Sequence, residues 1–572
     1  MGAARSAVST AALLAAAAAV WGDQAADAQP APYDEELSVE VINVEVHVTD
    51  RKGRPVRGLG REAFRLLEDG RPVEIDYFTE IDEAAPPPAT SSESPSADAR
   101  PPAATLPAGR EVRNLVIYLD DPNVGTAGRR RVLSALKQAI ASGGDGADRL
   151  MLVVHDEGLH VVQPFTEDRQ AVLDAIDGVA GRVTGIWKTL DRRDVFRAIQ
   201  DIYKKYEASL CGDPCECGWR EMEATVRDYA GLVATQVGAT ADGLSQMISA
   251  LSGVEGRNLL LYVSDGVQQR PGLDLFHYVA QVCPEFELEL TRNYIDRDQA
   301  PLINRLTSHA NANGVTFYTL EGAGLETDAD ISEVSHKFSP STLIRQVATA
   351  NRQSPLFALA DDTGGRAALN TNSFGAALQA VGTDFGSYYS LGFTSRHRGD
   401  GRLHRLEVEV AGRGLQVRHR SYYRDKELET RLAERVWSTL LLSTGSNAMG
   451  AEVEIGEPRA HGEKECCRVP VEIRVPLDRI TLGEAGIGRF YVVLAGRSST
   501  GKAMPIKGRE VVLEAEPGED RQSSRTLVVE VDLAPGSYEL AMGLLDYQSG
   551  GEAYVRTQVD VKAPAENAPG AR

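Results

Sequence analysis

The sequence lacks a second hydrophobic run like the one near its start. Beyond residues 7–20, no stretch approaches the roughly 18 apolar residues that a membrane-spanning helix needs. Residues 7–20 are themselves too few to span a bilayer, and they follow Arg5 and precede the small-residue motif Ala26-Asp27-Ala28. This pattern is typical of a secretory signal peptide that is cleaved before Gln29. We therefore expect residues 1–28 to be a signal peptide, and the mature chain to be soluble, exported to the periplasm or beyond, and not inserted in a membrane.

Positive charge is also in short supply. The chain has 61 Lys and Arg residues against 82 Asp and Glu residues, which gives a formal net charge of −21. Nucleic acids and anionic membranes are bound by basic surfaces, and a strongly acidic chain repels both. We therefore expect no nucleic-acid partner.

Complete catalytic motifs are missing. The sequence has no Gly-x-Ser-x-Gly nucleophile motif. The segment 155–160 (HDEGLH) lacks the histidine spacing of the zinc motif His-Glu-x-x-His. The segment 496–503 (GRSSTGKA) is close to a phosphate-binding loop, but Ala503 replaces the Ser or Thr that the motif needs. These observations favour a non-enzymatic protein, with a cell-envelope hydrolase or a purely structural envelope component as the alternatives.

Cysteine is scarce, and most of it is clustered. Four of the six cysteines lie within residues 211–283, and the other two, Cys466 and Cys467, are neighbours. An even number of cysteines in an exported protein favours disulfides. A disulfide between neighbouring residues is strained, so reduced or separately paired thiols are expected at 466 and 467. The first four allow three disulfide pairings, with a zinc site as the alternative; they are Cys211, Cys215, Cys217 and Cys283.

Three apolar runs of strand length are the main positive signal. They are 114–120 (NLVIYLD), 258–263 (NLLLYV) and 314–320 (GVTFYTL), and segments with helical periodicity separate them. Near-continuous apolar strands that alternate with helices indicate a parallel sheet covered on both faces. The expected fold class is therefore α/β, with a doubly wound, mostly parallel sheet.

Polar side chains follow two of these runs and mark a candidate site. Ligands of doubly wound sheets bind beyond the carboxyl ends of the strands. Asp120, Asp121 and Asn123 follow the first run, and Asp265 follows the second. We expect these four residues to line the rim that a ligand or partner contacts. The alternative is that the carboxylates only accept hydrogen bonds from adjacent loops and helix starts.

A basic segment opens the helix after the first strand. Residues 125–131 (GTAGRRR) combine free backbone N–H groups with three guanidinium groups, and such a helix start can hold an anion. The alternative is a solvated basic first turn near acidic partners.

The chain of 572 residues is too long for one hydrophobic core, so several domains are expected. The linker is identified by its Ala, Pro and Ser content, and the last domain by seven short strands at regular spacing, which suggest an immunoglobulin-like sandwich. In chain order we expect a signal peptide (1–28), a small β-rich domain (37–81), a linker (82–109), an α/β domain with cysteine-containing insertions (111–385), a β-rich extension (386–424), a helix (425–445), a β-sandwich (450–562) and a loose tail (563–572).

Six segments follow one another along the chain: 44–75, 113–121 (RNLVIYLDD), 260–266 (LLYVSDG), 311–320 (NANGVTFYTL), 359–367 (LADDTGGRA) and 386–393 (GSYYSLGF). In this order they resemble the von Willebrand factor A (VWFA)-related proteins that bacteria export. The resemblance implies an A-type, Rossmann-like domain that binds a protein or a surface ligand through the loops at the strand carboxyl ends.

The resemblance extends to a metal-ion-dependent adhesion site. Family members place Asp-x-Ser-x-Ser after the first strand and Asp after the fourth, and Asp120 and Asp265 match the two aspartates. Pro122 and Val124 stand where the serines are expected, so the site is degenerate. Because Mg²⁺ usually keeps several waters, the resemblance still implies Mg²⁺ or another divalent cation at Asp120 and Asp265. Without the ion, the same rim could bind a partner by shape and hydrogen bonds. The family's loop threonine has two candidates here, Thr184 and Thr189.

Overall fold

The structure is a computed structural model. It describes residues 41–82, 112–143, 147–180 except 157, 192–324 except 289 and 291–296, and 338–562 except 398, 443–444, 461–466, 484–485, 500–503, 505–506 and 515–522. The expected signal peptide, nearly all of the expected linker and the expected tail lie outside these residues. Among the described residues, no helix is both long and apolar enough to cross a membrane.

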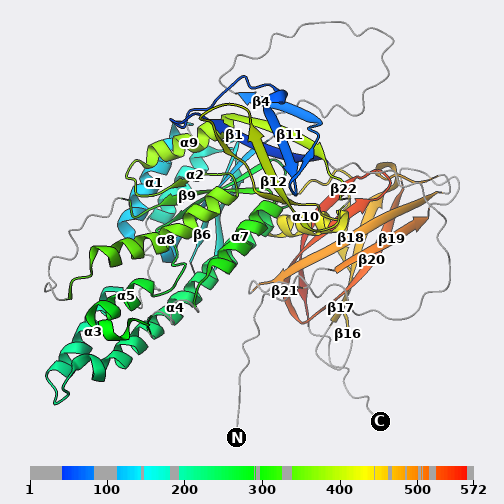
Figure 1. Cartoon of the computed structure of the whole chain (residues 1–572). Coiled ribbons are helices and arrows are strands. Elements are labelled where there is room, and N and C mark those ends of the chain that lie inside the picture. Colours follow the sequence, from blue (N-terminus) through cyan, green and yellow to red (C-terminus); the bar gives the residue numbers. More distant parts are fainter. Residues whose placement is uncertain are drawn as a thin grey trace, which may run out of the picture. The chain divides into compact units, whose positions relative to one another are not determined.

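A six-stranded sheet forms the centre of the α/β domain (Figure 1). Its strands lie in the order β10-β9-β8-β5-β6-β7, and all neighbours are parallel except the edge pair β6–β7. This is the strand order of a doubly wound sheet with β5 at its centre, which confirms the predicted mixed α/β class. The strands are β5 (Arg113–Asp120), β6 (Arg149–His155), β7 (Leu159–Thr166), β8 (Arg257–Ser264), β9 (Val315–Glu321) and β10 (Ala367–Ala368).

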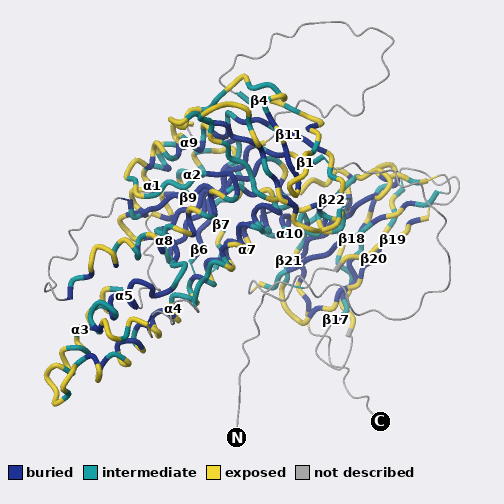
Figure 2. Tube along the Cα trace, viewed as in Figure 1, coloured by how far each residue is buried: buried dark blue, intermediate teal, exposed yellow. Residues whose placement is uncertain are grey.

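Helices cover both faces of this sheet, which explains the continuous apolar runs. Along β5, Leu115 and Ile117 join the core cluster under one helical layer, while Val116 and Tyr118 join the cluster under the other. Figure 2 shows the strands of this sheet as buried. The first layer contains α1 (Thr126–Ala141), α2 (Arg169–Ala180) and α9 (Phe374–Gly386). The second contains α4 (Pro214–Leu251), α7 (Ala300–Ala312) and α8 (Thr342–Asp362).

The cysteine-rich region joins two long helices. It connects α3 (Arg192–Glu207) to α4, and Asp213 caps α4 by accepting a hydrogen bond from the Cys215 N–H at 2.8 Å. Disulfides link Cys211 to Cys217 and Cys215 to Cys283, which follows α5 (Leu273–Val282). The four clustered cysteines are therefore paired with one another, and the zinc alternative is not needed. Cys467 is a buried free thiol.

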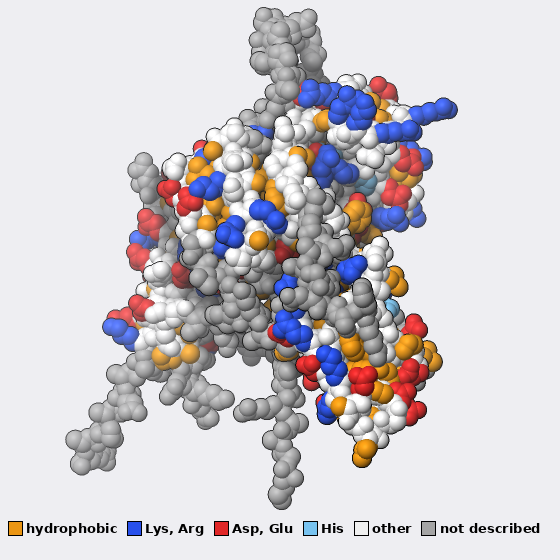
Figure 3. Space-filling model, turned by 90° about the vertical axis from the view of Figure 1, so that its left-hand side faces the viewer, with side chains coloured by type: hydrophobic (Ala, Val, Ile, Leu, Met, Phe, Trp, Pro, Cys, Tyr) orange, Lys and Arg blue, Asp and Glu red, His pale blue; other side chains and the backbone are white. Residues whose placement is uncertain are grey.

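The β-rich segments on either side of the α/β domain form shared sheets, which corrects the expected boundaries. Segments 37–81 and 386–424 were expected to be separate, but β1 pairs with β11 and β13, β4 with β11, and β2 with β12. A unit of about 50 residues buries too little surface alone, and this pairing completes its core. In Figure 3, Lys and Arg side chains gather at the upper right, level with the place of these strands in Figure 1. The strands are β1 (Val41–Thr49), β2 (Phe64–Glu68), β3 (Arg71–Val73), β4 (Tyr77–Asp82), β11 (Ser387–Thr394), β12 (Leu403–Val410), β13 (Gln416–Arg418) and β14 (Tyr422–Arg424).

The C-terminal part has two four-stranded antiparallel sheets that share one apolar core. Helix α10 (Leu428–Leu442) packs on the outer face of one sheet, where Gly543 leaves room for Val436. The immunoglobulin type that the sequence suggested for this region stays a prediction. The strands are β15 (Glu452–Ile455), β16 (Arg459–Ala460), β17 (Cys467–Pro476) and β20 (Ser524–Leu533) in one sheet, and β18 (Ile487–Ser498), β19 (Lys507–Glu514), β21 (Gly536–Asp546) and β22 (Glu552–Val561) in the other.

Candidate functional site

Asp120, the last residue of β5, is completely buried. Its Oδ2 atom accepts hydrogen bonds from Asn123 Nδ2 at 2.9 Å, Ser264 Oγ at 3.2 Å and the Tyr262 hydroxyl. These donors come from the turn after β5 and from the neighbouring strand β8. One oxygen of the carboxylate that was expected to face a ligand is therefore used inside the protein.

The second oxygen of Asp120 faces another buried polar group. Oδ1 lies 3.6 Å from His155 Nδ1 at the end of β6. Neither atom has a hydrogen-bond partner among the described residues, and the same holds for the neighbouring Tyr118 hydroxyl. Burial and the nearby Asp120 carboxylate hold the pKa of Tyr118 well above its usual range. All three side chains are almost fully enclosed, so this polar group has no route to a ligand in solution.

Asp121 forms a buried ion pair instead of lining the rim. Its Oδ1 atom accepts a hydrogen bond from Arg129 Nε at 2.9 Å, and Arg129 Nη2 also donates to the Val179 carbonyl at 3.0 Å. Burial raises the pKa of Asp121, although the Arg129 charge opposes this effect. The pair connects the turn after β5 to α1 and α2. This agrees with the alternative in which the carboxylate only accepts hydrogen bonds from adjacent parts of the chain.

Asn123 links the end of β5 to α4. Its Nδ2 atom donates to both Asp120 and Thr240 Oγ1, the latter at 2.9 Å, and its Oδ1 atom accepts from Gln236 Nε2 at 2.9 Å. All of its side-chain hydrogen-bonding atoms therefore have partners within the protein. Sequence reasoning missed Thr240, Gln236, Tyr262 and His155, and only Ser264 lay beside a predicted site residue.

Asp265 directly follows β8, and its side chain contacts the start of α1. Its Oδ2 atom accepts a hydrogen bond from the Gly125 N–H at 2.7 Å, and its own N–H donates to the Asn123 carbonyl at 2.6 Å. A β-carbon on Gly322 would lie only 2.9 Å from Asp265 Oδ1, so the loop after β9 closes over this carboxylate. Burial raises the pKa of Asp265 to about 6.

The two aspartates do not form a donor set that fits a divalent cation. Asp120 is held by side-chain donors from β8, whereas Asp265 is held by the backbone at the start of α1. Pro122 and Val124 offer no side-chain oxygen, and Val124 is buried in the core. Among the described residues, no third His, Cys, Asp or Glu joins either aspartate at metal-ligand spacing. The candidate threonines at 184 and 189 lie outside the described residues.

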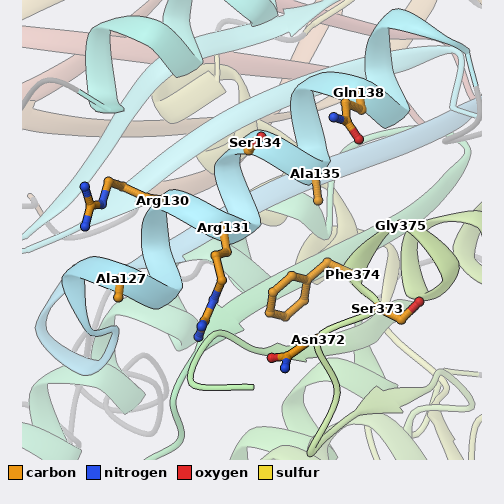
Figure 4. Close-up of a pocket in the computed structure, with 10 residues that line it drawn as sticks. All are labelled: Ala127, Arg130, Arg131, Ser134, Ala135, Gln138, Asn372, Ser373, Phe374 and Gly375. Carbon is orange, nitrogen blue, oxygen red and sulfur yellow. The ribbon is translucent and has the colours of Figure 1, made fainter. Parts of the chain in front are cut away.

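An open groove of about 760 Å³ lies beside this rim, between α1 and the start of α9 (Figure 4). Arg130, Arg131 and Gln138 of α1 line one side, and Asn372 and Ser373 line the other. Figure 4 shows Arg131 extending toward Asn372, beside the ring of Phe374, while Arg130 extends away from that ring. Sequence reasoning had noted the basic segment of α1 but not the facing wall.

The arginines of the groove have different surroundings. Arg131 Nη2 donates to the carbonyls of Gly322 at 3.2 Å and Ala323 at 2.6 Å, so it is anchored to the loop after β9. Arg130 is exposed, and no ion pair is found for it within the described part of the chain. The N-terminus of helix α9 lines the same groove with Ser373, Phe374 and Gly375, so the partial positive charge of the helix lies there, and no side-chain hydrogen bond from its N-cap Ser373 caps this end. The groove is therefore electropositive on a chain whose net charge is −21.

Gly128 sets how closely α1 approaches the loop after β9. A β-carbon at this position would lie 2.3 Å from the Gly322 carbonyl oxygen. Only glycine allows this approach, which brings Arg131 within reach of its two carbonyls. Gly128 and Gly322 therefore shape the groove without lining it.

Comparisons with known proteins find only remote similarity. No family model and no curated protein matches the chain. Among solved structures, an aerotolerance-related membrane protein from Bacteroides fragilis is 10% identical with a TM-score of 0.20, covering 48% of this chain and 98% of its own. Manganese-loaded Plasmodium vivax TRAP protein is 10% identical with a TM-score of 0.20, covering 54% and 94%. Proximal thread matrix protein 1 from the mussel byssus is 10% identical with a TM-score of 0.21, covering 47% of each chain. Similarities at this level carry no argument about what this chain binds.

Proposed function

We propose that this protein is an exported, non-enzymatic binding protein whose α/β domain holds an acidic segment of a partner protein in the groove between α1 and α9. The observation that carries the proposal is the groove itself, which combines Arg130, Arg131 and the uncapped start of α9. Carboxylates are favoured both by guanidinium groups and by helix N-termini.

A metal ion is no part of this proposal. In an adhesion-type site the cation would link the protein to an acidic side chain of the partner. Here one oxygen of each carboxylate, Oδ2 of Asp120 and of Asp265, accepts hydrogen bonds from the chain itself. The guanidinium groups of the groove supply the positive charge that the partner's carboxylate needs.

The buried state of the polar residues near β5 supports a non-enzymatic role. A hydrolytic centre needs a general base that substrate and water can reach. The only described histidine beside Asp120 is His155, which is 4% exposed. A substrate could not reach this pair without separating the sheet from α4, against which it packs.

The experiment is fluorescence anisotropy of a labelled Glu-rich peptide titrated with the purified chain, with a Lys-rich peptide of equal length as the probe control. We expect saturable binding of the acidic peptide only, which weakens as salt rises. Arg130→Ala/Arg131→Ala should weaken it roughly three- to tenfold, because one or two charged contacts are lost. Arg130→Ala alone tests the groove without disturbing the loop contacts of Arg131.

Lys137→Ala is the matched control. Lys137 lies on the same helix and carries the same charge, but it pairs with Asp177 of α2. Its removal should leave the affinity unchanged, and EDTA should have no effect. Equal affinities for wild type and both arginine variants would refute the groove as the binding site. Loss of binding in EDTA, with the fold shown to be intact by circular dichroism, would refute the metal-independent mechanism.

A further inference from the structure

Two histidines that do not line the groove stack on each other in the β-rich unit. The rings of His397 and His404 lie 3.6 Å apart between centroids, with 18° between their planes. His404, on β12, is 5% exposed, and His397, in the loop between β11 and β12, is partly exposed. The proposed binding function involves neither residue.

Each ring nitrogen of this pair faces a carboxylate oxygen. His404 Nδ1 lies 2.9 Å from Asp69 Oδ2, and His404 Nε2 lies 3.2 Å from Asp400 Oδ1. His397 Nε2 lies 3.4 Å from Glu68 Oε2, and His397 Nδ1 lies 3.8 Å from Asp400 Oδ2. Two imidazoles are thus surrounded by three carboxylates from two segments of the chain. Ligand atoms of Asp69, His397 and His404 all lie within 4.8 Å of one another.

The cluster brings three carboxylates to two imidazole rings. Two imidazolium cations stacked face to face would repel each other, so protons on the rings do not balance all three negative charges. A single divalent cation takes one nitrogen from each ring and offsets two carboxylate charges at once.

Neighbouring groups hold the carboxylates in position. Asp69 has a positive φ of 49° in the turn between β2 and β3, and its Oδ1 atom accepts a hydrogen bond from the Arg405 N–H at 2.9 Å. Glu68 Oε1 accepts a hydrogen bond from the Tyr423 hydroxyl. Metal ligands are commonly oriented by such outer hydrogen bonds.

The histidine loop is anchored in the same way. Ser395 Oγ accepts a hydrogen bond from the His397 N–H at 3.1 Å and donates to Asp425 Oδ2 at 2.5 Å. Asp425 is 1% exposed, and its Oδ1 atom has no hydrogen-bond partner among the described residues. The cluster is therefore held by residues from β2, β12, β14 and the loop between β11 and β12.

We propose that His397, His404 and Asp69, with Asp400 or Glu68 as the fourth ligand, bind one Zn²⁺ ion. Imidazole nitrogens select zinc over the hard ions Mg²⁺ and Ca²⁺, which prefer all-oxygen sites. Binding requires the partly exposed His397 ring to turn out of the stack, so that one nitrogen of each ring points at the ion. The ion would fasten the β2–β3 hairpin to a loop more than 300 residues later in the chain, which makes it a structural site.

The test is calorimetric titration of the purified, non-reduced full chain with ZnCl₂ after metal removal by EDTA and dialysis. We expect one Zn²⁺ per chain, no comparable binding of MgCl₂, and a melting temperature that rises with zinc concentration. Titration in two buffers of different protonation enthalpy should show proton release, because the ligand nitrogens must lose their protons.

Variants decide whether the site is the one proposed. His397→Ala should weaken zinc binding at least tenfold, and because this side chain is partly exposed the variant should fold. His404→Asn should do the same, with its fold checked by circular dichroism. His160→Ala is the control, because His160 also pairs with an aspartate, Asp156, but outside any cluster. No saturable zinc binding in wild type, or equal affinity in wild type and His397→Ala, would overturn the proposal.

Discussion

The Asp265 carboxylate accepts a hydrogen bond from the backbone N–H of Gly125, with 2.7 Å between Oδ2 and the nitrogen. Gly125 is the N-cap of α1 and has no side chain with which to cap the helix. A carboxylate at this position satisfies a free N–H group and interacts favourably with the helix dipole. The residue that resembles a metal-binding aspartate by sequence therefore acts here as a cap for α1. It is supplied from the end of β8, the strand beside β5 in the sheet.

Burial of this carboxylate predicts an unusual dependence of stability on pH. Burial raises the pKa of Asp265 to about 6 in the folded protein, from an ordinary value of 3.8, although the Gly125 hydrogen bond opposes the shift. The folded state therefore binds the proton more tightly, so the contribution of this group to stability is fully present below about pH 3.8 and is lost as pH rises through about 6. Asp265→Asn keeps an oxygen for the Gly125 N–H and removes the titration.

The measurement is the free energy of unfolding of wild type and Asp265→Asn in urea between pH 4 and pH 8. The difference between the two proteins should change by roughly 2–3 kcal/mol across this range, with the variant gaining relative to wild type as pH rises. Other titrating groups, such as the buried His47 and His309, affect both proteins equally. A difference that stays constant with pH would show that the carboxylate is not protonated preferentially in the folded state.

The buried pair of Asp121 and Arg129 predicts strong coupling between two substitutions. Asp121→Asn leaves the 3%-exposed Arg129 with a buried charge and should lower the free energy of unfolding by about 3–5 kcal/mol. Asp121→Asn combined with Arg129→Met should cost much less than the sum of the single changes, since no unpaired charge remains. A double-mutant cycle in urea measures this coupling. Additive effects would show that the pair is not a unit.

The sequence predicted the central sheet because its strands have little choice of environment. All eight residues of β5 and of β8 are buried, so their apolar runs are nearly continuous and their ends fall within one residue of the predicted bounds. The pairing of β1 with β11 could not be predicted in the same way. It pairs Val46 with Tyr389, two residues that are separated in sequence by the whole α/β domain. The alternating pattern of a strand does not by itself specify which strand it pairs with.

The candidate site could be located but its bonding could not. Asp120 and Asp265 were correctly placed at strand ends, because this follows from the sheet. Their partners depend on side chains brought together only by the fold, such as Tyr262, which is 142 residues from Asp120. The histidine cluster shows the same limit. The spacing of His397 and His404 is visible in the sequence, whereas the turn containing Asp69 is separated from it by most of the chain.

The two disulfides should contribute unequally to stability. Cys215–Cys283 closes a loop with a sequence separation of 68, and Cys211–Cys217 one of 6. In the chain-entropy model the longer loop is worth roughly 4 kcal/mol and the shorter roughly 2 kcal/mol. Cys215→Ala/Cys283→Ala should therefore lower the melting temperature more than Cys211→Ala/Cys217→Ala. Thermal unfolding followed by circular dichroism compares the two, and a larger effect of the shorter loop would contradict this account.

Gly128→Ala should weaken both the fold and the groove. The added methyl group would lie 2.3 Å from the Gly322 carbonyl oxygen, which is too close for any relaxed contact, so α1 must move away from the loop after β9. We expect a loss of about 1–3 kcal/mol in the free energy of unfolding. The same movement should break the hydrogen bonds of Arg131 to the Gly322 and Ala323 carbonyls. Because these bonds position Arg131 in the groove, the affinity for the Glu-rich peptide should fall as well.

Gly178→Ala separates this effect from the general consequence of replacing a helical glycine. Gly178 lies in α2, and a β-carbon there would meet no atom within 4 Å. That substitution should be neutral or stabilise by up to about 1 kcal/mol, because alanine favours helix more than glycine does. Peptide binding should also be unchanged. If Gly128→Ala bound the peptide as tightly as Gly178→Ala does, the close approach of α1 to Gly322 would not be what positions Arg131 in the groove.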